Sequence, residues 1–446
     1  MYIPSAVEPF LLQFSCVFSQ PTFHRFATLM LLAILTTGRR TVSNLLRTAP
    51  SMVSGHASSY HRVFSRRQWV VLNVGRILAQ CVLDYLVPTG PVHLAVDDTV
   101  DGHRGKHVHG QACHRDAVRS SHCFTAYRWG HKWVVLAVLV NVPFTHRPWA
   151  LPVLVALYYS KEWNQKHGRR HKTPPHLARQ LLALLLRWFP ERRFILTGDG
   201  GFSTHDLACA AQRRSGRAVF VGRFYPDANL YTRPALSKGV GRPRIKGRKL
   251  AAPKEVVART RKRQRLTVRW YGGGNRRVEI VTGTGYWYRA GQGLVPVRWV
   301  YVRDLSGTHR DEYFFSTDPQ MAPGQIIQIF TGRWSIEVTF QEMRAYMGLE
   351  TTSGWTCNTV LRMAPCLFGL YSVVVLLYLW LPDEVRQERG IEWAGKSTVT
   401  FSDVLTAVRR WLWQYWIFET GQHQVAFSKL PVALRQLLCY ALAPAA

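Results

Sequence analysis

Residues 1–90 carry apolar side chains at helical spacing. The stretch 26–49 repeats them every three or four positions until Gly38-Arg39-Arg40 interrupts the pattern, and Thr41 to Ser43 can cap a second helix. The stretch 61–86 repeats the same spacing. The first 90 residues are therefore predicted to form helices joined by short turns.

From residue 91 the pattern changes to that of strands. Apolar, β-branched runs cover 92–98, 132–142 and 150–159, and two later runs, 193–201 and 218–224, alternate with helical stretches at 177–189 and 203–214. Strands that first follow one another and then alternate with helices are typical of a mixed sheet with helices on its faces. The fold class predicted is α/β.

Residues 225–305 interrupt this pattern and are predicted to form an inserted, β-rich segment of short strands. A core strand at 312–318 and one helix over 323–349 follow. The tail from 381 to 446 is mostly helical, and its aromatic run 409–418 fits either a core or an assembly surface. The apolar run 366–381 is shorter than the ~18 residues typical of a membrane span, so it is interpreted as a buried core helix.

The charge of the chain narrows the class of partner. The 446 residues include 58 Lys and Arg against 26 Asp and Glu, a formal charge of +32. Such a protein binds a polyanion, and with the membrane set aside this indicates nucleic acid. The basic helices of residues 1–90 then fit a small DNA-binding domain, although a plain helical bundle has the same pattern. Eight cysteines without a CxxC pair indicate a reducing, cytoplasmic setting.

The basic residues concentrate in the insertion. Between Arg233 and Arg277 stand sixteen Lys and Arg and a single acid. The stretch 239–249 resembles an AT-hook, which lies in a narrow minor groove, or else forms a basic linker. Under either interpretation Arg242, Arg244 and Lys246 are expected to contact DNA.

A second unusual stretch, 102–123, contains five histidines and two cysteines, but their spacing matches no common zinc pattern. It is interpreted as a basic, substrate-facing loop between core strands rather than as a metal site. Asp101, just before it, is interpreted as a turn residue.

Three carboxylates stand out by their positions. Asp98 and Asp199 each follow an apolar strand, and Glu337 lies in a helix. The two-residue period of a strand places Asp97 and Asp98 on opposite faces, so only one of them can face a given site. Carboxylates at the ends of buried strands are costly unless they are paired or bind a metal, and oxygen ligands suit Mg²⁺.

The helix around Glu337 adds cationic partners. Phe330, Arg333, Glu337 and Arg344 lie at helical spacing on one stripe, which places the acid between two guanidinium groups. Alone, this pattern fits a solvated Arg–Glu pair worth a few tenths of a kcal/mol. Together with the strand-end acids and the basic insertion, it favours a site that acts on phosphates.

These residues resemble the signature of a known family. The stretch IFTGRWSIEVTFQEMRAYMGLE matches the Y-(2)-R-(3)-E-(6)-K spacing of bacterial insertion-sequence transposases of the DDE superfamily, the cut-and-paste branch with a ribonuclease-H-like core. Phe330 replaces the Tyr and Arg344 replaces the Lys. LAVDDT is similar to the first-aspartate strand of the family and selects Asp98, while LTGDGGF is similar to the second and gives Asp199.

The resemblance implies a DNA transposase. Asp98, Asp199 and Glu337 would be catalytic and would hold two Mg²⁺ ions, with Mn²⁺ as a substitute, to hydrolyse phosphodiesters at element ends and transfer strands into target DNA. Phe330, Arg333 and Arg344 would contact DNA, and Trp334 or Trp287 would stack on a flipped base. The partners implied are double-stranded DNA and a second copy of the chain on that DNA, in a bacterial cytoplasm at the nucleoid.

The resemblance also divides the chain. It implies a helical DNA-binding domain (1–90), two parts of a ribonuclease-H-like core (91–224 and 306–380), a basic β-rich insertion (225–305) and a helical C-terminal region (381–446). Two alternatives remain: a transposase-derived DNA-binding protein without activity, and a metal-dependent DNA nuclease without strand transfer.

Overall fold

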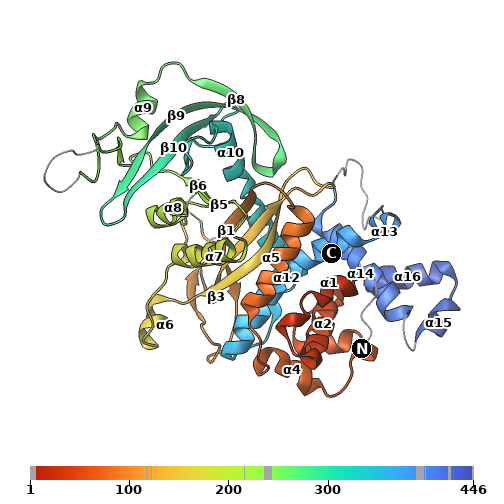
Figure 1. Ribbon diagram of the computed structural model, residues 1–446. Helices are drawn as coiled ribbons and strands as arrows, with labels where there is room; N and C mark the ends of the chain where they lie inside the picture. The colour runs from red at the N-terminus through yellow and green to blue at the C-terminus, as the bar shows by residue number, and fades with distance from the viewer. Residues whose placement is uncertain are drawn as a thin grey trace.

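The N-terminal helices pack onto the rest of the chain through one continuous hydrophobic core. The computed structural model describes residues 7–116, 119–121, 123–214, 216–235, 244–387, 396, 398–419 and 423–443. The Thr41 side chain accepts a hydrogen bond from the Asn44 N–H and so caps a helix where the sequence predicts one. The first helices are α1 (Glu8–Leu12), α2 (Gln20–Leu35), α3 (Val42–Thr48), α4 (Ala57–Ser65) and α5 (Val71–Leu86) (Figure 1).

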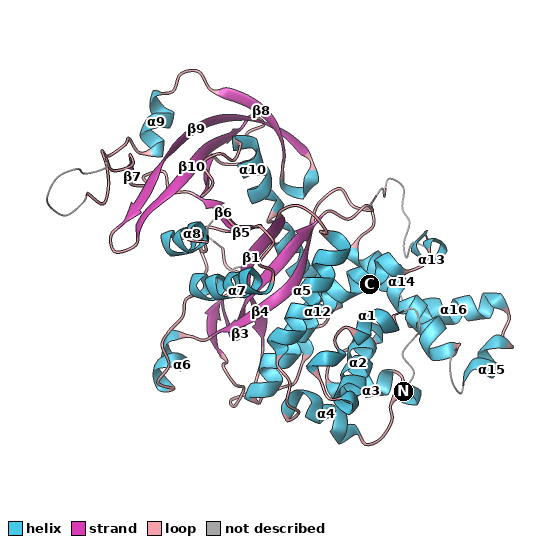
Figure 2. Cartoon of the chain, in the orientation of Figure 1, coloured by secondary structure: helices cyan, strands magenta, loops and turns pink. Residues whose placement is uncertain are grey.

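The centre of the molecule is a mixed sheet (Figure 2). Its first six strands are β1 (Val92–Gly102), β2 (Ala112–Arg115), β3 (Tyr127–Val140), β4 (Trp149–Tyr158), β5 (Phe194–Gly198) and β6 (Ala218–Arg223). Strand β3 pairs antiparallel with β1 and with β4, whereas β1, β5 and β6 run parallel. The order β4-β3-β1-β5-β6, with helices on the faces, confirms the predicted α/β class and is the order expected of a ribonuclease-H-like sheet.

Three helices follow β4 and β5: α6 (Lys161–Lys166), α7 (Pro174–Trp188) and α8 (His205–Gln212). Of these, α7 packs on β3 and β4, and α8 packs on β6. Helix α7 begins at two prolines and buries an apolar stripe from Leu177 to Leu186, as its helical spacing predicts.

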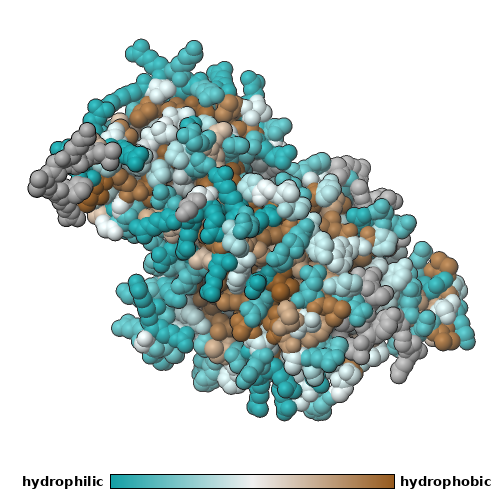
Figure 3. All heavy atoms as spheres, in the orientation of Figure 1, coloured by the Kyte–Doolittle hydropathy of each residue, from teal (hydrophilic) through white to brown (hydrophobic). Residues whose placement is uncertain are grey.

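The region of the basic insertion continues the core sheet. It contains β7 (Leu230–Tyr231), α9 (Pro253–Arg259), β8 (Gln264–Arg269), β9 (Asn275–Arg289) and β10 (Gly293–Asp304), and it leads to β11 (Glu312–Ser316). Strands were expected over 266–272, 276–290 and 295–304, and β8, β9 and β10 lie there. They were expected to be short, but β9 has 15 residues and β10 has 12, and both join the core through β11, which pairs with β6. Hydrophilic side chains cover much of the visible face of this region (Figure 3).

The predicted helix 323–349 is two helices, α10 (Pro323–Gly332) and α11 (Ser335–Tyr346). At the junction the N–H groups of Trp334 and Ile336 bond to carbonyls three residues earlier, so the turn tightens after Gly332. The remaining elements are α12 (Cys357–Trp380), α13 (Asp383–Gln387), α14 (Phe401–Leu412), the π-helix η5 (Trp413–Phe418), α15 (Gln424–Ser428) and α16 (Val432–Leu442).

Helix α12 is long and apolar enough to cross a membrane by length and composition. Most of its apolar residues, including Phe368 and Tyr371, are buried against the sheet and neighbouring helices, as the interpretation of residues 366–381 as a core helix predicts. In the aromatic run 409–418, Trp411, Trp413 and Trp416 are buried, so the rings of these three residues belong to the core.

Candidate active site

The register of two parallel strands brings two aspartates to the same edge of the sheet. Val96 on β1 pairs with Gly198, the last residue of β5, so Asp97 and Asp199 are the next residues on neighbouring strands. Adjacent strands lie about 4.8 Å apart. Asp199 begins a turn in which its Oδ1 accepts the N–H groups of Gly201, at 2.9 Å, and of Phe202, at 3.2 Å. The turn fixes the carboxyl group of Asp199 at the strand end.

Arg333 joins one of these aspartates to the glutamate of α11. Its Nη1 donates to Asp97 Oδ2 and its Nη2 donates to Glu337 Oε1, each at 2.9 Å. The Arg333 side chain is buried, that of Asp97 is 15% exposed and that of Glu337 is 45% exposed. One guanidinium therefore holds two carboxylates from distant segments side by side, with the glutamate open to solvent.

Asp98 lies on the other face of β1. Its Oδ1 forms an ion pair at 3.0 Å with Nζ of Lys132. Lys132 of β3 pairs with Val100 of β1, and Val100 lies on the same face of β1 as Asp98. Arg333, at the end of α10, and Arg344 of α11 instead contact the face of Asp97: Arg333 donates to Asp97 itself and Arg344 donates to Thr99. The structure thus brings Asp97, and not the predicted Asp98, together with Glu337.

The buried position of Asp97 raises the pKa of its carboxyl group. Burial is the main cause, and the negative charges of Asp199 and Asp98 add to it, while Arg333 works against it; the resulting pKa is about 8. Burial also raises the pKa of Asp98, and Lys132 opposes that shift. Carboxylates that repel one another in a partly buried cleft are stabilised by a bound cation.

Two residues predicted to contact DNA are instead buried. The Phe330 ring stacks on Phe314, with centroids 4.2 Å apart, inside the core between α10 and the sheet. Trp287 packs against His205, Phe224 and Phe315. The prediction that their rings contact DNA is not supported, because both side chains fill the hydrophobic core as large aromatic residues usually do.

The remaining predicted DNA-binding residues differ in exposure. Arg344 is held by Thr99 and by Glu350, 3.5 Å away, so its charge already has a partner. Trp334 is exposed at the junction of α10 and α11. Arg244 and Lys246 are exposed, and Lys246 Nζ lies 4.5 Å from the ring centroids of Tyr231 and Tyr288; Arg242 falls outside the described residues.

An open cleft lies at the end of β1, and none of Asp97, Asp199 and Glu337 lines it. Part of its lining, from Gly102 to Val108, belongs to the stretch 102–123 that was interpreted as a substrate-facing loop. The cleft has a volume of about 1000 Å³ and combines cations with aromatic rings. Trp129 and Trp355 line it and are 63% and 60% exposed. Glu350, which pairs with Arg344, connects its wall to α11. The cations that line it are Arg39, Arg104, Lys106, Arg119 and Arg128.

Asp101 was also interpreted wrongly. It was expected at a turn, but it lies inside β1 and is fully buried. The strand continues beyond the apolar run because Asp101 pairs with His131 across the β1–β3 ladder.

Comparison with known families decides the relationship of this chain. The model of the DDE superfamily endonuclease family matches residues 13–277, more than half of the chain. This protein belongs to the DDE superfamily of endonucleases. A second family model, described as the archaeal putative transposase ISC1217, matches residues 278–378 of this DDE endonuclease and so includes Glu337.

Comparisons with solved structures and with curated proteins say less about this DDE endonuclease than the family models do. A solved structure of the piggyBac transposase synaptic complex with hairpin DNA aligns with a TM-score of 0.44 and 11% identity, covering 95% of this chain and 76% of that one. Curated proteins give no match.

Membership of this family suggests a chemical role for the carboxylate cluster. A DDE endonuclease uses divalent metal ions, and the chemistry of the donors present fits them: Asp97, Asp199 and Glu337 offer only oxygen atoms, the ligands that hard cations such as Mg²⁺ prefer.

Proposed function

We propose that this DDE endonuclease is a DNA transposase that hydrolyses phosphodiesters at the ends of its element and transfers the freed strands into target DNA. The observation that carries this proposal is the meeting of Asp97 and Glu337 on one guanidinium, with Asp199 at the next strand end. The match of residues 278–378 to a transposase model supports strand transfer over simple cleavage.

Asp97, Asp199 and Glu337 are the proposed ligands of two Mg²⁺ ions. When bound, these ions lower the pKa of a water molecule and neutralise charge on the phosphodiester. Glu337 is half-exposed at the first turn of α11, where an incoming phosphate has access to it. Arg333 keeps Asp97 and Glu337 within reach of the same cations, and its guanidinium is a strong donor to phosphate oxygens.

The cleft lined by Trp129 and Trp355 is the proposed path of the DNA toward this site. Exposed aromatic rings interleaved with cations bind nucleic acid by stacking and by charge, and stacking is worth about 1–3 kcal/mol per base. Arg244 and Lys246 add phosphate contacts from the basic insertion. Because an element has two ends, a second copy of the chain is proposed to join the first on DNA.

The direct test uses DNA that carries the sequences flanking the gene. Wild-type protein with Mg²⁺ is expected to release 3′-OH ends at the element boundary and to join them to a target plasmid, whereas Glu337→Gln and EDTA-treated protein do neither. Glu342→Gln is the matched control, because Glu342 lies on the same helix but bonds to Tyr371. Cutting without joining would identify a nuclease, and binding without cutting would identify an inactive descendant.

A second experiment addresses the cleft. Trp355→Ala is expected to weaken binding of DNA at least about 5-fold, since ~1 kcal/mol is the lower value for a stacked base. Trp355→Phe keeps a ring and should retain most of the affinity. Equal binding by both variants would remove the cleft from the DNA path.

A further inference from the structure

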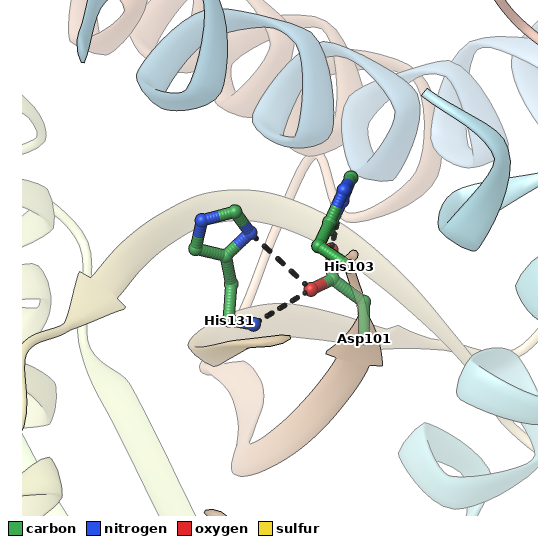
Figure 4. Close-up of side chains that lie close together, drawn as sticks. All are labelled: Asp101, His103 and His131. Atoms are coloured by element: carbon green, nitrogen blue, oxygen red, sulfur yellow. Dashed lines mark hydrogen bonds and ion pairs between the residues drawn. The ribbon is translucent and has the colours of Figure 1, made fainter. Parts of the chain in front are cut away.

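A second group of side chains that could hold a metal ion surrounds Asp101, which lies four residues beyond Asp97 on β1. Asp101, His103 and His131 place one ligand atom each within 4.8 Å of one another, and all three are buried (Figure 4). Asp101 is on the strand, His103 follows its end and His131 is the partner of Asp101 on β3. Asp101 and His131 both lie outside the histidine-rich stretch 102–123, so the spacing within that stretch could not show the group.

The hydrogen bonds of His131 leave one ring nitrogen without a partner. Its Nε2 lies 2.9 Å from the carbonyl oxygen of His109, and a carbonyl can only accept, so Nε2 carries the hydrogen. In a neutral ring Nδ1 then has a free lone pair. This atom is buried without a hydrogen bond and faces Asp101 Oδ1 at 3.5 Å. Two acceptors face each other, which is unfavourable unless a cation lies between them.

The distances fit a metal better than hydrogen bonds. His131 Nδ1 and His103 Nε2 lie 3.5 and 3.6 Å from the Asp101 oxygens, beyond the 2.7–3.2 Å range of an N–H···O bond. Ligands about 2.0–2.2 Å from a tetrahedral Zn²⁺ are separated by roughly 3.3–3.6 Å. The separation of each imidazole from Asp101 therefore fits two ligands of one ion, and the three ligand atoms all lie within 4.8 Å of one another.

Neighbouring groups orient these ligands as in known metal sites. The backbone N–H of His131 donates to Asp101 Oδ1 at 3.0 Å, and the indole N–H of Trp133 donates to Oδ2 at 2.9 Å. The His109 carbonyl fixes the tautomer of His131. Such outer partners hold a carboxylate and an imidazole in place for a metal. His103 also lines the open cleft, which gives an ion a path to the site.

We propose that Asp101, His103 and His131 bind one Zn²⁺ ion, with water as the fourth ligand. The mixed nitrogen and oxygen donor set suits zinc rather than Mg²⁺. The ion fixes His103, at the start of the loop 103–111, to strand β3. This loop forms part of the cleft wall, so zinc stabilises the wall without taking part in catalysis.

The test is metal binding to the purified full chain. After removal of metals, wild type is expected to bind one Co²⁺ with the visible absorption of a four-coordinate site, and Zn²⁺ should displace it. His103→Gln and His131→Gln should each weaken binding at least about 100-fold, because each removes a direct ligand. His107→Gln, an exposed histidine of the same loop, is the matched control and should bind as wild type.

Two further measurements show whether this site is independent of the proposed catalytic carboxylates and whether its ion stabilises the fold. Asp97→Asn should keep the cobalt spectrum, which makes the result independent of transposition. Zn²⁺ should raise the melting temperature of wild type and of His107→Gln but not of His103→Gln. Absence of the cobalt band in folded wild type, or its retention in both ligand variants, would overturn the proposal and leave a protonated His131 paired with Asp101.

Discussion

Asp97 and Asp101 lie on one face of β1, and the two clusters that they belong to have opposite characters. The cluster of Asp97, Asp199 and Glu337 contains only carboxylates, is open to solvent at Glu337 and is bridged by Arg333. The cluster of Asp101, His103 and His131 contains one carboxylate and two imidazoles, and it is closed. The two clusters differ in the type of their ligands and in their access to solvent. These two properties, rather than acidity alone, distinguish a site for exchangeable ions from a site for a resident ion.

The largest effect is expected on the rate of DNA cleavage, and it should differ between the two neighbouring aspartates of β1. Asp97→Asn should reduce the rate of DNA cleavage by more than about 10³-fold, because a metal ligand contributes several kcal/mol to the transition state and 1.36 kcal/mol is a factor of ten. Asp98→Asn is the matched control and should reduce it far less, since its carboxylate pairs with Lys132 on the other face. The reverse order of the two rates would restore Asp98 as the ligand.

A smaller effect is expected at the bridging arginine. Arg333→Lys keeps the charge but cannot donate to Asp97 and Glu337 in fork geometry, so cleavage should slow by roughly 10- to 100-fold. Arg147→Lys is a suitable control, because Arg147 pairs with Glu342 instead, at 3.5 Å. Single-turnover rates would measure the difference, and equal rates for the two variants would show that the bridge has no role in positioning.

The closed cluster should govern stability rather than activity. Asp101→Asn keeps its size but replaces one acceptor oxygen with a donor, so the indole of Trp133 or the N–H of His131 loses its partner. The free energy of unfolding should fall by about 1–3 kcal/mol in metal-free protein. Urea denaturation would measure this change, and Asp97→Asn should show no comparable loss. An equal loss in both variants would contradict the division of roles.

A further effect concerns pH. The pKa of Asp97 is raised to about 8, chiefly by burial, so the folded chain retains a proton that the unfolded chain releases near pH 4. The stability of metal-free wild type should therefore fall as pH rises from about 4 to 8. Asp97→Asn lacks this titration and should show a smaller fall in urea midpoints over that range. Parallel curves would show that Asp97 is ionised throughout.

Much of the fold was predictable because periodicity reports burial directly. The apolar strands, the alternation of helices and the cap at Thr41 follow from local patterns. The positions of β9 and β10 also followed, but their place in the core sheet did not, because a strand pattern does not report which strands pair. The single helix over 323–349 was wrong because nothing in its spacing reports the tightened turn at Arg333.

The candidate site was predictable in part. The segments that carry its acids, and Arg333, could be named from motif spacing. The choice between Asp97 and Asp98 could not be predicted from the pattern. The period of a strand assigns the two residues to opposite faces, but it does not show which face contacts α11. Likewise His131 is brought to Asp101 only by the pairing of β1 with β3, and a buried Trp287 has the same sequence signal as an exposed Trp129.

The bridge at Arg333 has a consequence for the order of events. In the metal-free chain the guanidinium of Arg333 occupies one oxygen of Asp97 and one oxygen of Glu337. Divalent ions would therefore meet two carboxyl groups that already lie side by side, and their positive charge would weaken the hold of Arg333 on both groups. A loosened guanidinium beside an arriving phosphate would let loading of the ions and capture of DNA reinforce each other.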